Sequence, residues 1–138
     1  MFSQWLLSAP HNLARLWAEG ARKVRGMRER REAFENLRKA RGVTLLREWL
    51  SPEQQAQFDA LRYFEVIGCD TGSRYRIRHG TQTNVHELDN EGRPIMGWCF
   101  VPSGPLVAGD VMLAQKIALE TNERAALAVA NRFSVVGR

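Results

Sequence analysis

The chain has 138 residues, of which 44% are hydrophobic and 25% are charged, and its formal net charge is +5. This length allows a sizeable core, and this composition argues against intrinsic disorder. No window approaches the roughly 18 apolar residues of a membrane span, and no cation precedes the short apolar run MFSQWLLSAP, so we expect a cytoplasmic protein without a secretory signal.

The positive charge is concentrated near the N-terminus. Residues 1–50 hold 11 Lys and Arg against 5 Glu, a net charge of +6, whereas residues 51–138 hold 9 against 10 acidic residues, a net charge of −1. Arginines greatly outnumber lysines, and the planar guanidinium favours bidentate binding of phosphate and carboxylate. We therefore expect a basic amphipathic helical arm over residues 1–50 and a core domain over residues 51–138.

Residues 12–41 have the periodicity of an amphipathic helix. Pro10 precedes them at a position where a helix can start, and Arg41-Gly42 is typical of a helix end. Arg30 and Arg31 interrupt the apolar stripe, which disfavours a long uninterrupted coiled coil. The apolar positions are Leu13, Leu16, Trp17, Val24, Met27, Phe34 and Leu37.

A second helix is predicted from residue 51 to about residue 61. Ser51 suits the N-cap, Pro52 the first helical position, and Gln54 completes a capping box. A third helix is predicted from Asp110 or Val111 to Arg132, where the chain is rich in Ala and Leu and has no internal Gly or Pro.

Residues 63–102 predict a four-stranded, mainly antiparallel sheet, because short runs of strand-forming residues are separated by turn signals at 70–73 and 89–92. The apolar run 95–101 is the candidate for the central strand. Gly97 within it indicates a bulge or a close approach, most simply by a helix. The fold class is therefore α+β, with the sheet covered by the helices that begin near residues 51 and 110.

Alternation along residues 74–79 places Tyr75, Ile77 and His79 on one face and three arginines on the other. These arginines and the cations of residues 22–31 are candidates for binding anions or nucleic-acid phosphates, with Tyr75 or Trp98 available for stacking. The candidate anion-binding residues are Arg22, Lys23, Arg25, Arg28, Arg30, Arg31, Arg74, Arg76 and Arg78. The alternative is that both faces are simply solvated.

The residues that metal sites or catalysis require are present but poorly spaced. Cys69, His79, His86 and Cys99 are suitable zinc ligands, yet their spacing matches no compact zinc module, so two buried thiols and no metal are expected. For a small enzyme of unknown class, the candidates are Cys99 and His86 with its acidic neighbours Glu87 and Asp89. No catalytic motif accompanies them, and no cofactor, catalytic residue or small-molecule substrate is predicted.

The N-terminal apolar residues favour a contact with another molecule. Phe2, Trp5, Leu6, Leu13 and Trp17 are the candidates for binding a partner. We therefore expect a non-enzymatic binding or assembly protein, in which this segment engages another protein or a second copy of the chain. The first alternative is a nucleic-acid-binding accessory protein, and a membrane surface is disfavoured as a partner.

From residue 64 to 131, the order TGSRYRIRHG, TNVHELD, WCFVP and GDVMLAQKIALE resembles a strand-then-helix module of small uncharacterised bacterial and phage-type proteins. The resemblance covers about half of the chain. It implies a module boundary and an intracellular bacterial or phage setting, and it implies no function.

Overall fold

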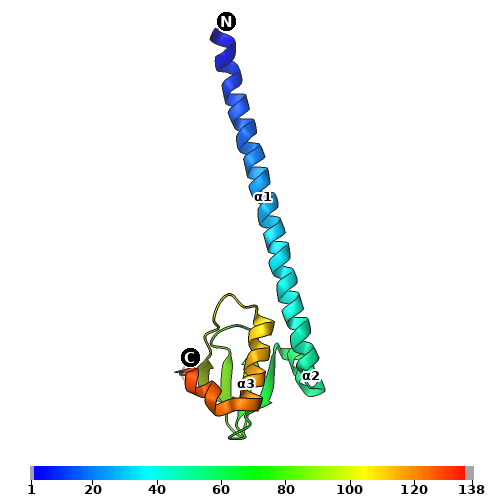
Figure 1. The fold of residues 1–138 in the computed structure, drawn as a ribbon, viewed down its shortest axis with the longest axis vertical. Helices are drawn as coiled ribbons and strands as arrows, with labels where there is room; N and C mark the ends of the chain where they lie inside the picture. The colour runs from blue at the N-terminus through cyan, green and yellow to red at the C-terminus, as the bar shows by residue number, and fades with distance from the viewer. Residues whose placement is uncertain (1, 136–138) are drawn as a thin grey trace. The chain divides into compact units, whose positions relative to one another are not determined.

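A computed structural model describes the backbone of residues 2–135 and the side chains of residues 11–135. The α+β class is confirmed, because three helices accompany one antiparallel sheet (Figure 1). The elements are α1 (Phe2–Trp49), α2 (Pro52–Leu61), β1 (Tyr63–Ile67), β2 (Arg74–Arg78), β3 (Val85–Leu88), β4 (Pro94–Cys99), α3 (Ala108–Val129) and β5 (Asn131–Phe133).

The chain divides into two compact units, an N-terminal unit (Met1–Leu37) and a C-terminal unit (Arg38–Arg138). The boundary between these compact units lies within α1, whereas the charge distribution predicts a boundary between arm and core domain at residue 50. Leu46 of α1 and Leu50, just after its end, are 0% and 5% exposed and belong to the hydrophobic core of the C-terminal unit. The last turns of α1 are therefore part of the core.

Helix α1 is longer at both ends than its sequence signals indicated. It begins at Phe2 rather than after Pro10, and it passes through Gly42 to end at Trp49. Gly42 is not a helix stop but a site of close contact: a Cβ on Gly109 of α3 would overlap the Gly42 backbone, and a Cβ on Gly42 would crowd the Val107 side chain. The two glycines allow these helices to touch in the C-terminal unit.

The predicted start of α2 is confirmed in detail. The Ser51 hydroxyl accepts a hydrogen bond from the Gln54 amide, and the Gln54 side chain accepts one from the Ser51 amide. The Gln54 side chain also donates to the Glu65 carbonyl in β1, at 2.9 Å. The capping box therefore fixes the helix start and ties it to the sheet.

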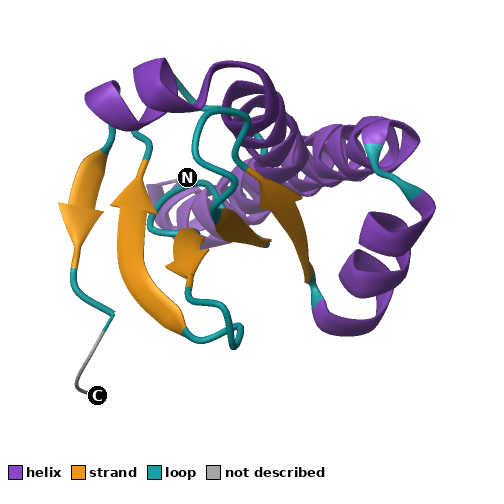
Figure 2. Cartoon of the chain, turned by 90° about the horizontal axis from the view of Figure 1, so that it is seen from below, coloured by secondary structure: helices purple, strands orange, loops and turns teal. Residues whose placement is uncertain are grey.

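The sheet has five strands in the order β1-β2-β3-β4-β5, all antiparallel, rather than the four expected (Figure 2). Its central strand is β3, so the apolar run around β4 is not the centre. The side-chain alternation within β2 is confirmed, because Tyr75 and Ile77 are 1% and 0% exposed whereas Arg78 is exposed. His79, which was predicted on the inner face, lies just after the strand and is exposed. The sheet therefore has one inner face and one outer face.

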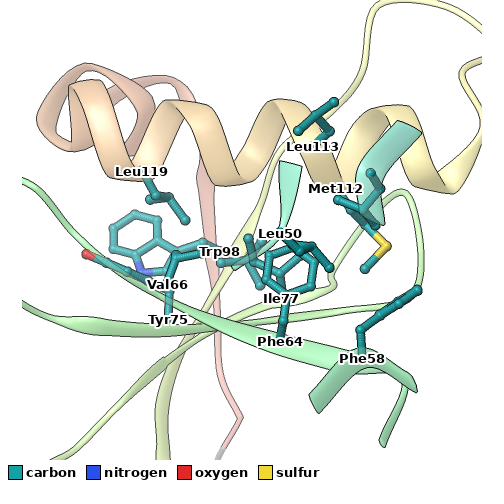
Figure 3. Packing of buried hydrophobic residues seen from close by; sticks show 12 residues of the cluster. Leu50, Phe58, Phe64, Val66, Tyr75, Ile77, Trp98, Met112, Leu113 and Leu119 are labelled. Carbon is teal, nitrogen blue, oxygen red and sulfur yellow. The ribbon is translucent and has the colours of Figure 1, made fainter. Parts of the chain in front are cut away.

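Helix α3 covers the inner face of the sheet. In Figure 3, Leu119 and Met112 extend from α3 toward the side chains of the strands. Phe58 of α2 meets Phe64 of β1 edge to face, with ring centroids 6.3 Å apart. These helices and strands enclose one core, as the arrangement of apolar residues in the sequence predicted.

The fifth strand lies in a segment that was expected to be helical. Helix α3 ends at Val129, Ala130 is extended, and β5 pairs with β4. Phe133 of β5 lies on the outer face directly over Gly97, where any Cβ would overlap its ring. The close approach predicted at Gly97 is therefore confirmed, but it involves a strand side chain and not a helix.

Candidate functional site

The N-terminal unit presents its apolar side chains to solvent. Trp17 is 77% exposed, Leu13 57% and Phe34 62%. The other exposed apolar residues of the stripe are Leu16, Val24, Met27 and Leu37. The predicted partner residues Leu13 and Trp17 thus lie on one accessible stripe, whereas the side chains of Phe2, Trp5 and Leu6 lie outside the described residues.

The cations of residues 22–31 are exposed along the same helix. Arg22 and Arg30 donate to carbonyls four residues earlier, those of Ala18 and Gly26, and Arg31 forms an exposed ion pair with Glu35 at 3.5 Å. Such contacts are worth a few tenths of a kcal/mol and leave a side chain accessible. These side chains, with Lys23, Arg25 and Arg28, remain candidates for anion binding.

The three strand arginines share the outer face of the sheet, but they already have partners there. Arg74 and Arg76 donate to opposite oxygens of Glu65, at 2.6 and 3.3 Å. The guanidinium carbons of Arg76 and Arg78 lie 4.5 and 5.6 Å from the centroid of the Tyr63 ring. Phosphate binding on this face would compete with these contacts.

The aromatic residues proposed for stacking lie on the opposite face. Tyr75 and Trp98 are 1% and 6% exposed and belong to the core. They cannot stack with a ligand on the arginine face, so that part of the nucleic-acid hypothesis is wrong.

The metal and enzyme candidates do not converge. Across the residues that the structure describes, no group of three or more His, Cys, Asp or Glu side chains is placed to hold a metal ion. Both cysteines are free, and the prediction that they are buried is wrong, because Cys69 is exposed and Cys99 is half-buried.

His86 does not share a face with Glu87. Its ring meets Phe133 on the outer face, whereas Glu87 accepts from Trp98 Nε1 on the inner face. Burial and the neighbouring Arg78 and Arg76 lower the pKa of His86. This histidine and its acidic neighbour are therefore not arranged as an acid–base pair.

The most elaborate polar arrangement surrounds Glu123 of α3, which is fully buried. Its carboxylate accepts hydrogen bonds from the Tyr75 hydroxyl at 2.6 Å, the Thr71 hydroxyl at 2.6 Å and the amides of Asp70 and Thr71. Gly68 lies against the carboxylate, where a Cβ would overlap it. The loop after β1 therefore wraps around a single buried anion.

The same loop supports a break in α3. Asn122 has non-helical dihedral angles, φ −156° and ψ 55°, so the helix is interrupted there. Cys69 Sγ accepts the Glu123 amide at 3.4 Å, and Asp70 Oδ2 accepts the Arg124 amide at 2.9 Å. The loop and the helix break therefore exchange hydrogen bonds in both directions.

The network determines the ionisation of its members. Burial alone would raise the pKa of Glu123, but hydrogen bonds from Thr71, Tyr75 and Asp70 outweigh it and hold the pKa below its ordinary value. Burial and the adjacent Glu123 raise the pKa of the Tyr75 hydroxyl. Glu123 is thus an anion and Tyr75 a neutral donor at neutral pH.

Sequence reasoning missed Glu123 entirely. A single Glu within a helical pattern is most often solvated, and only its spatial position beside the 70–73 turn gives it a role. That turn was predicted and is confirmed, with Gly72 at a φ of 73°.

No known protein family model matches this chain, and no curated protein or solved structure matches it. Within the described part of the chain, no helix combines the length and apolar character needed to cross a bilayer.

Proposed function

We propose that this is an assembly protein without catalytic function that self-associates by antiparallel pairing of the N-terminal units of two copies. The observation that carries the proposal is the exposed apolar stripe from Leu13 to Leu37. A protein partner of another kind is the main competing occupant, and the experiments below separate the two.

A solvent-exposed helix of this composition is expected to have low stability by itself. Helices in proteins owe most of their stability to packing of an apolar face, and each internal glycine costs about 1 kcal/mol relative to Ala. The N-terminal unit contains Gly20 and Gly26, and no side chain lies within 4 Å of where a Cβ would stand on either. Burial of the stripe against a second helix supplies the missing stabilisation.

The shape of the stripe favours an antiparallel partner. Trp17 projects beside a hollow over Gly20 and Ala21, bounded further along by Val24. In a parallel pair, Trp17 would face Trp17 and Gly20 would face Gly20. The interface would then be overpacked at the two tryptophan side chains and would contain a void at the two glycines. An antiparallel pair places Trp17 of one copy over Gly20 of the other, and the same register places Leu13 against Val24.

Charge favours the same register. Residues 23–31 contain Lys23, Arg25, Arg28, Arg30 and Arg31 against the single acid Glu29. Parallel pairing would bring these two cationic segments together, at a cost for each pair of like charges. The antiparallel register instead places residues 23–31 beside residues 6–14, which contain no Lys, Arg, Asp or Glu.

Sedimentation of the full chain tests self-association. We expect a reversible monomer–dimer equilibrium that weakens in the Trp17→Ala variant. Gly20→Leu fills the hollow and should also weaken it, although leucine raises helix propensity and apolarity. Gly26→Leu is the matched control, because Gly26 lies about 120° away from Gly20 around the helix, and it should leave the equilibrium unchanged.

The orientation is tested with a spin label at Glu29→Cys in a chain whose Cys69 and Cys99 are replaced by Ser. Antiparallel pairing in the proposed register separates the two labels by about 30 Å, since residue 29 lies beside residue 8 at 1.5 Å per residue. Parallel pairing would bring them within about 15 Å. A monomer at all concentrations, or a dimer strengthened by Gly20→Leu, would overturn the proposal.

A further inference from the structure

Independently of the N-terminal unit, we infer that the C-terminal unit contains a binding cleft for a small organic anion between the end of α3 and the inner face of the sheet. The cleft has a volume of about 620 Å³. This volume is within the usual range for small-molecule sites and is large enough for one substituted ring. Its principal polar residues are Ser73, Glu87, Trp98, Arg124 and Arg132.

The cleft exists because α3 breaks at Asn122 and ends at Val129. Before the break, Met112 and Leu119 of α3 are fully buried in the core. Beyond the break, Leu127, Ala128 and Ala130 line the cleft instead of filling it. Small side chains at two of these three positions leave room above Trp98.

Two guanidinium groups supply the charge that selects an anion. Arg124 and Arg132 both line the cleft and are exposed, and neither forms an ion pair with a carboxylate among the described side chains. Other arginines of the C-terminal unit, such as Arg47, Arg74 and Arg93, do pair with a carboxylate. A carboxylate or phosphate is the natural partner of guanidinium groups that have no carboxylate partner within the protein.

The remaining walls orient the bound molecule. The guanidinium carbon of Arg132 lies 5.1 Å from the centroid of the Trp98 ring, and Trp98 Nε1 donates to Glu87 at 3.1 Å. The hydroxyls of Thr71 and Tyr75 are turned toward Glu123, so they do not offer donors to a ligand. The anionic group is therefore held at the arginines, and the apolar part of the ligand lies against Leu127 and Ala128.

Glu87 and the buried Glu123 limit which anions are accepted. Glu87 lines the cleft. If a ligand carried a negative charge at each end, the end that is not bound by the arginines would be repelled by the Glu87 carboxylate. Glu123 is fully buried and its hydrogen bonds are satisfied within the protein, so its charge acts on the cleft from behind Tyr75. One anionic group at one end of an apolar body suits this arrangement best.

The experiment is a titration of the full chain with benzoate, phenyl phosphate and benzylamine, followed by the NMR signal of the Trp98 indole N–H. We expect both anions to shift this signal with a dissociation constant on the order of 1 mM, and the cation not to shift it. Comparison of benzoate with phenyl phosphate decides which anionic group the cleft prefers.

Variants make the assignment specific. Arg124→Gln and Arg132→Gln should each weaken anion binding about tenfold, since each removes a charge-assisted hydrogen bond. Arg93→Gln, at an exposed arginine that does not line the cleft, should leave binding unchanged. Absence of a shift with either anion, an equal response to benzylamine, or full binding in the Arg124→Gln/Arg132→Gln double variant would overturn the inference. None of these readouts depends on self-association.

Discussion

The two units contain the same kinds of residue in opposite environments. Phe34 in the N-terminal unit is 62% exposed, whereas Phe64 in β1 is 0% exposed. Glu35 forms an exposed pair with Arg31, whereas Glu123 is buried and receives hydrogen bonds from a loop and a strand. In the C-terminal unit the chain buries such groups itself, and in the N-terminal unit it leaves them exposed.

This contrast indicates where the free energy of each unit originates. Burial of apolar surface is the main stabilising term in folding, and the C-terminal unit obtains it within one chain. The stripe of the N-terminal unit is exposed, and in the proposed assembly a second copy of the chain would supply this burial. Equivalent substitutions in the two units therefore test the contrast directly.

The largest difference is expected for Phe→Ala. Phe64→Ala removes a buried ring from the core and should lower the free energy of unfolding by about 3–5 kcal/mol. Phe34→Ala removes an exposed ring and should leave the unfolding of the C-terminal unit unchanged. Urea denaturation followed by near-ultraviolet circular dichroism measures both. Equal losses in the two variants would show that the N-terminal unit belongs to the same core.

The second largest difference in stability between the units is expected for Glu→Gln. Glu123→Gln leaves the Tyr75 and Thr71 donors facing a weaker acceptor, and we expect a loss of about 2–4 kcal/mol. Glu35→Gln affects an exposed pair and should change stability by less than about 0.5 kcal/mol. A loss below that level at Glu123 would contradict the role assigned to the network.

The Glu123→Gln substitution should also change the pH dependence of the free energy of unfolding. The folded-state pKa of Glu123 is below its ordinary value of 4.5, so the carboxylate stabilises the fold above that value. This contribution is lost as the pH falls through the lowered pKa. The acid limb of the stability curve should therefore be flatter in Glu123→Gln than in the unchanged protein.

Local signals predicted most of the elements, and long-range contacts decided the rest. Ser51 and Gln54 identified the start of α2, because a capping box acts between neighbouring residues. Gly42 was interpreted as a helix end, since the sequence does not show that Gly109 packs against it. Strand β5 was missed because its pairing with β4 overrides the helical preference of the Ala-rich segment before it.

The candidate surfaces followed the same rule. The apolar stripe could be predicted from the periodicity of its residues, because periodicity is a local property of the sequence. The cleft and the Glu123 network could not be predicted from the sequence, since residues from α3 and several strands meet only after folding. The sequence alone could name the arginines of β2, but it could not show that Glu65 engages two of them.

The effect of Gly→Ala on stability should have opposite signs in the two units. Gly109→Ala introduces a Cβ that overlaps the Gly42 backbone, so the helices must separate, at a cost of about 1–3 kcal/mol. Gly26→Ala meets no atom within 4 Å and should increase the helix content of the N-terminal unit, by about 1 kcal/mol at that position. Thermal unfolding and far-ultraviolet circular dichroism measure the two effects. A stabilised Gly109→Ala variant would disprove the close crossing of α1 and α3.

The smallest contrast concerns surface ion pairs. The Glu65 side chain is 17% exposed and pairs with both Arg74 and Arg76, whereas the Glu19 side chain is 49% exposed and pairs with Arg15. Glu65→Gln should cost about 1 kcal/mol, and Glu19→Gln about 0.3 kcal/mol of helix stability. High salt should largely abolish the effect at Glu19 and leave most of the effect at Glu65, since salt screens exposed charges more than half-buried ones. Equal salt sensitivity at the two positions would mean that the outer face of the sheet is as open as the N-terminal helix, and that its arginines are free to bind phosphate.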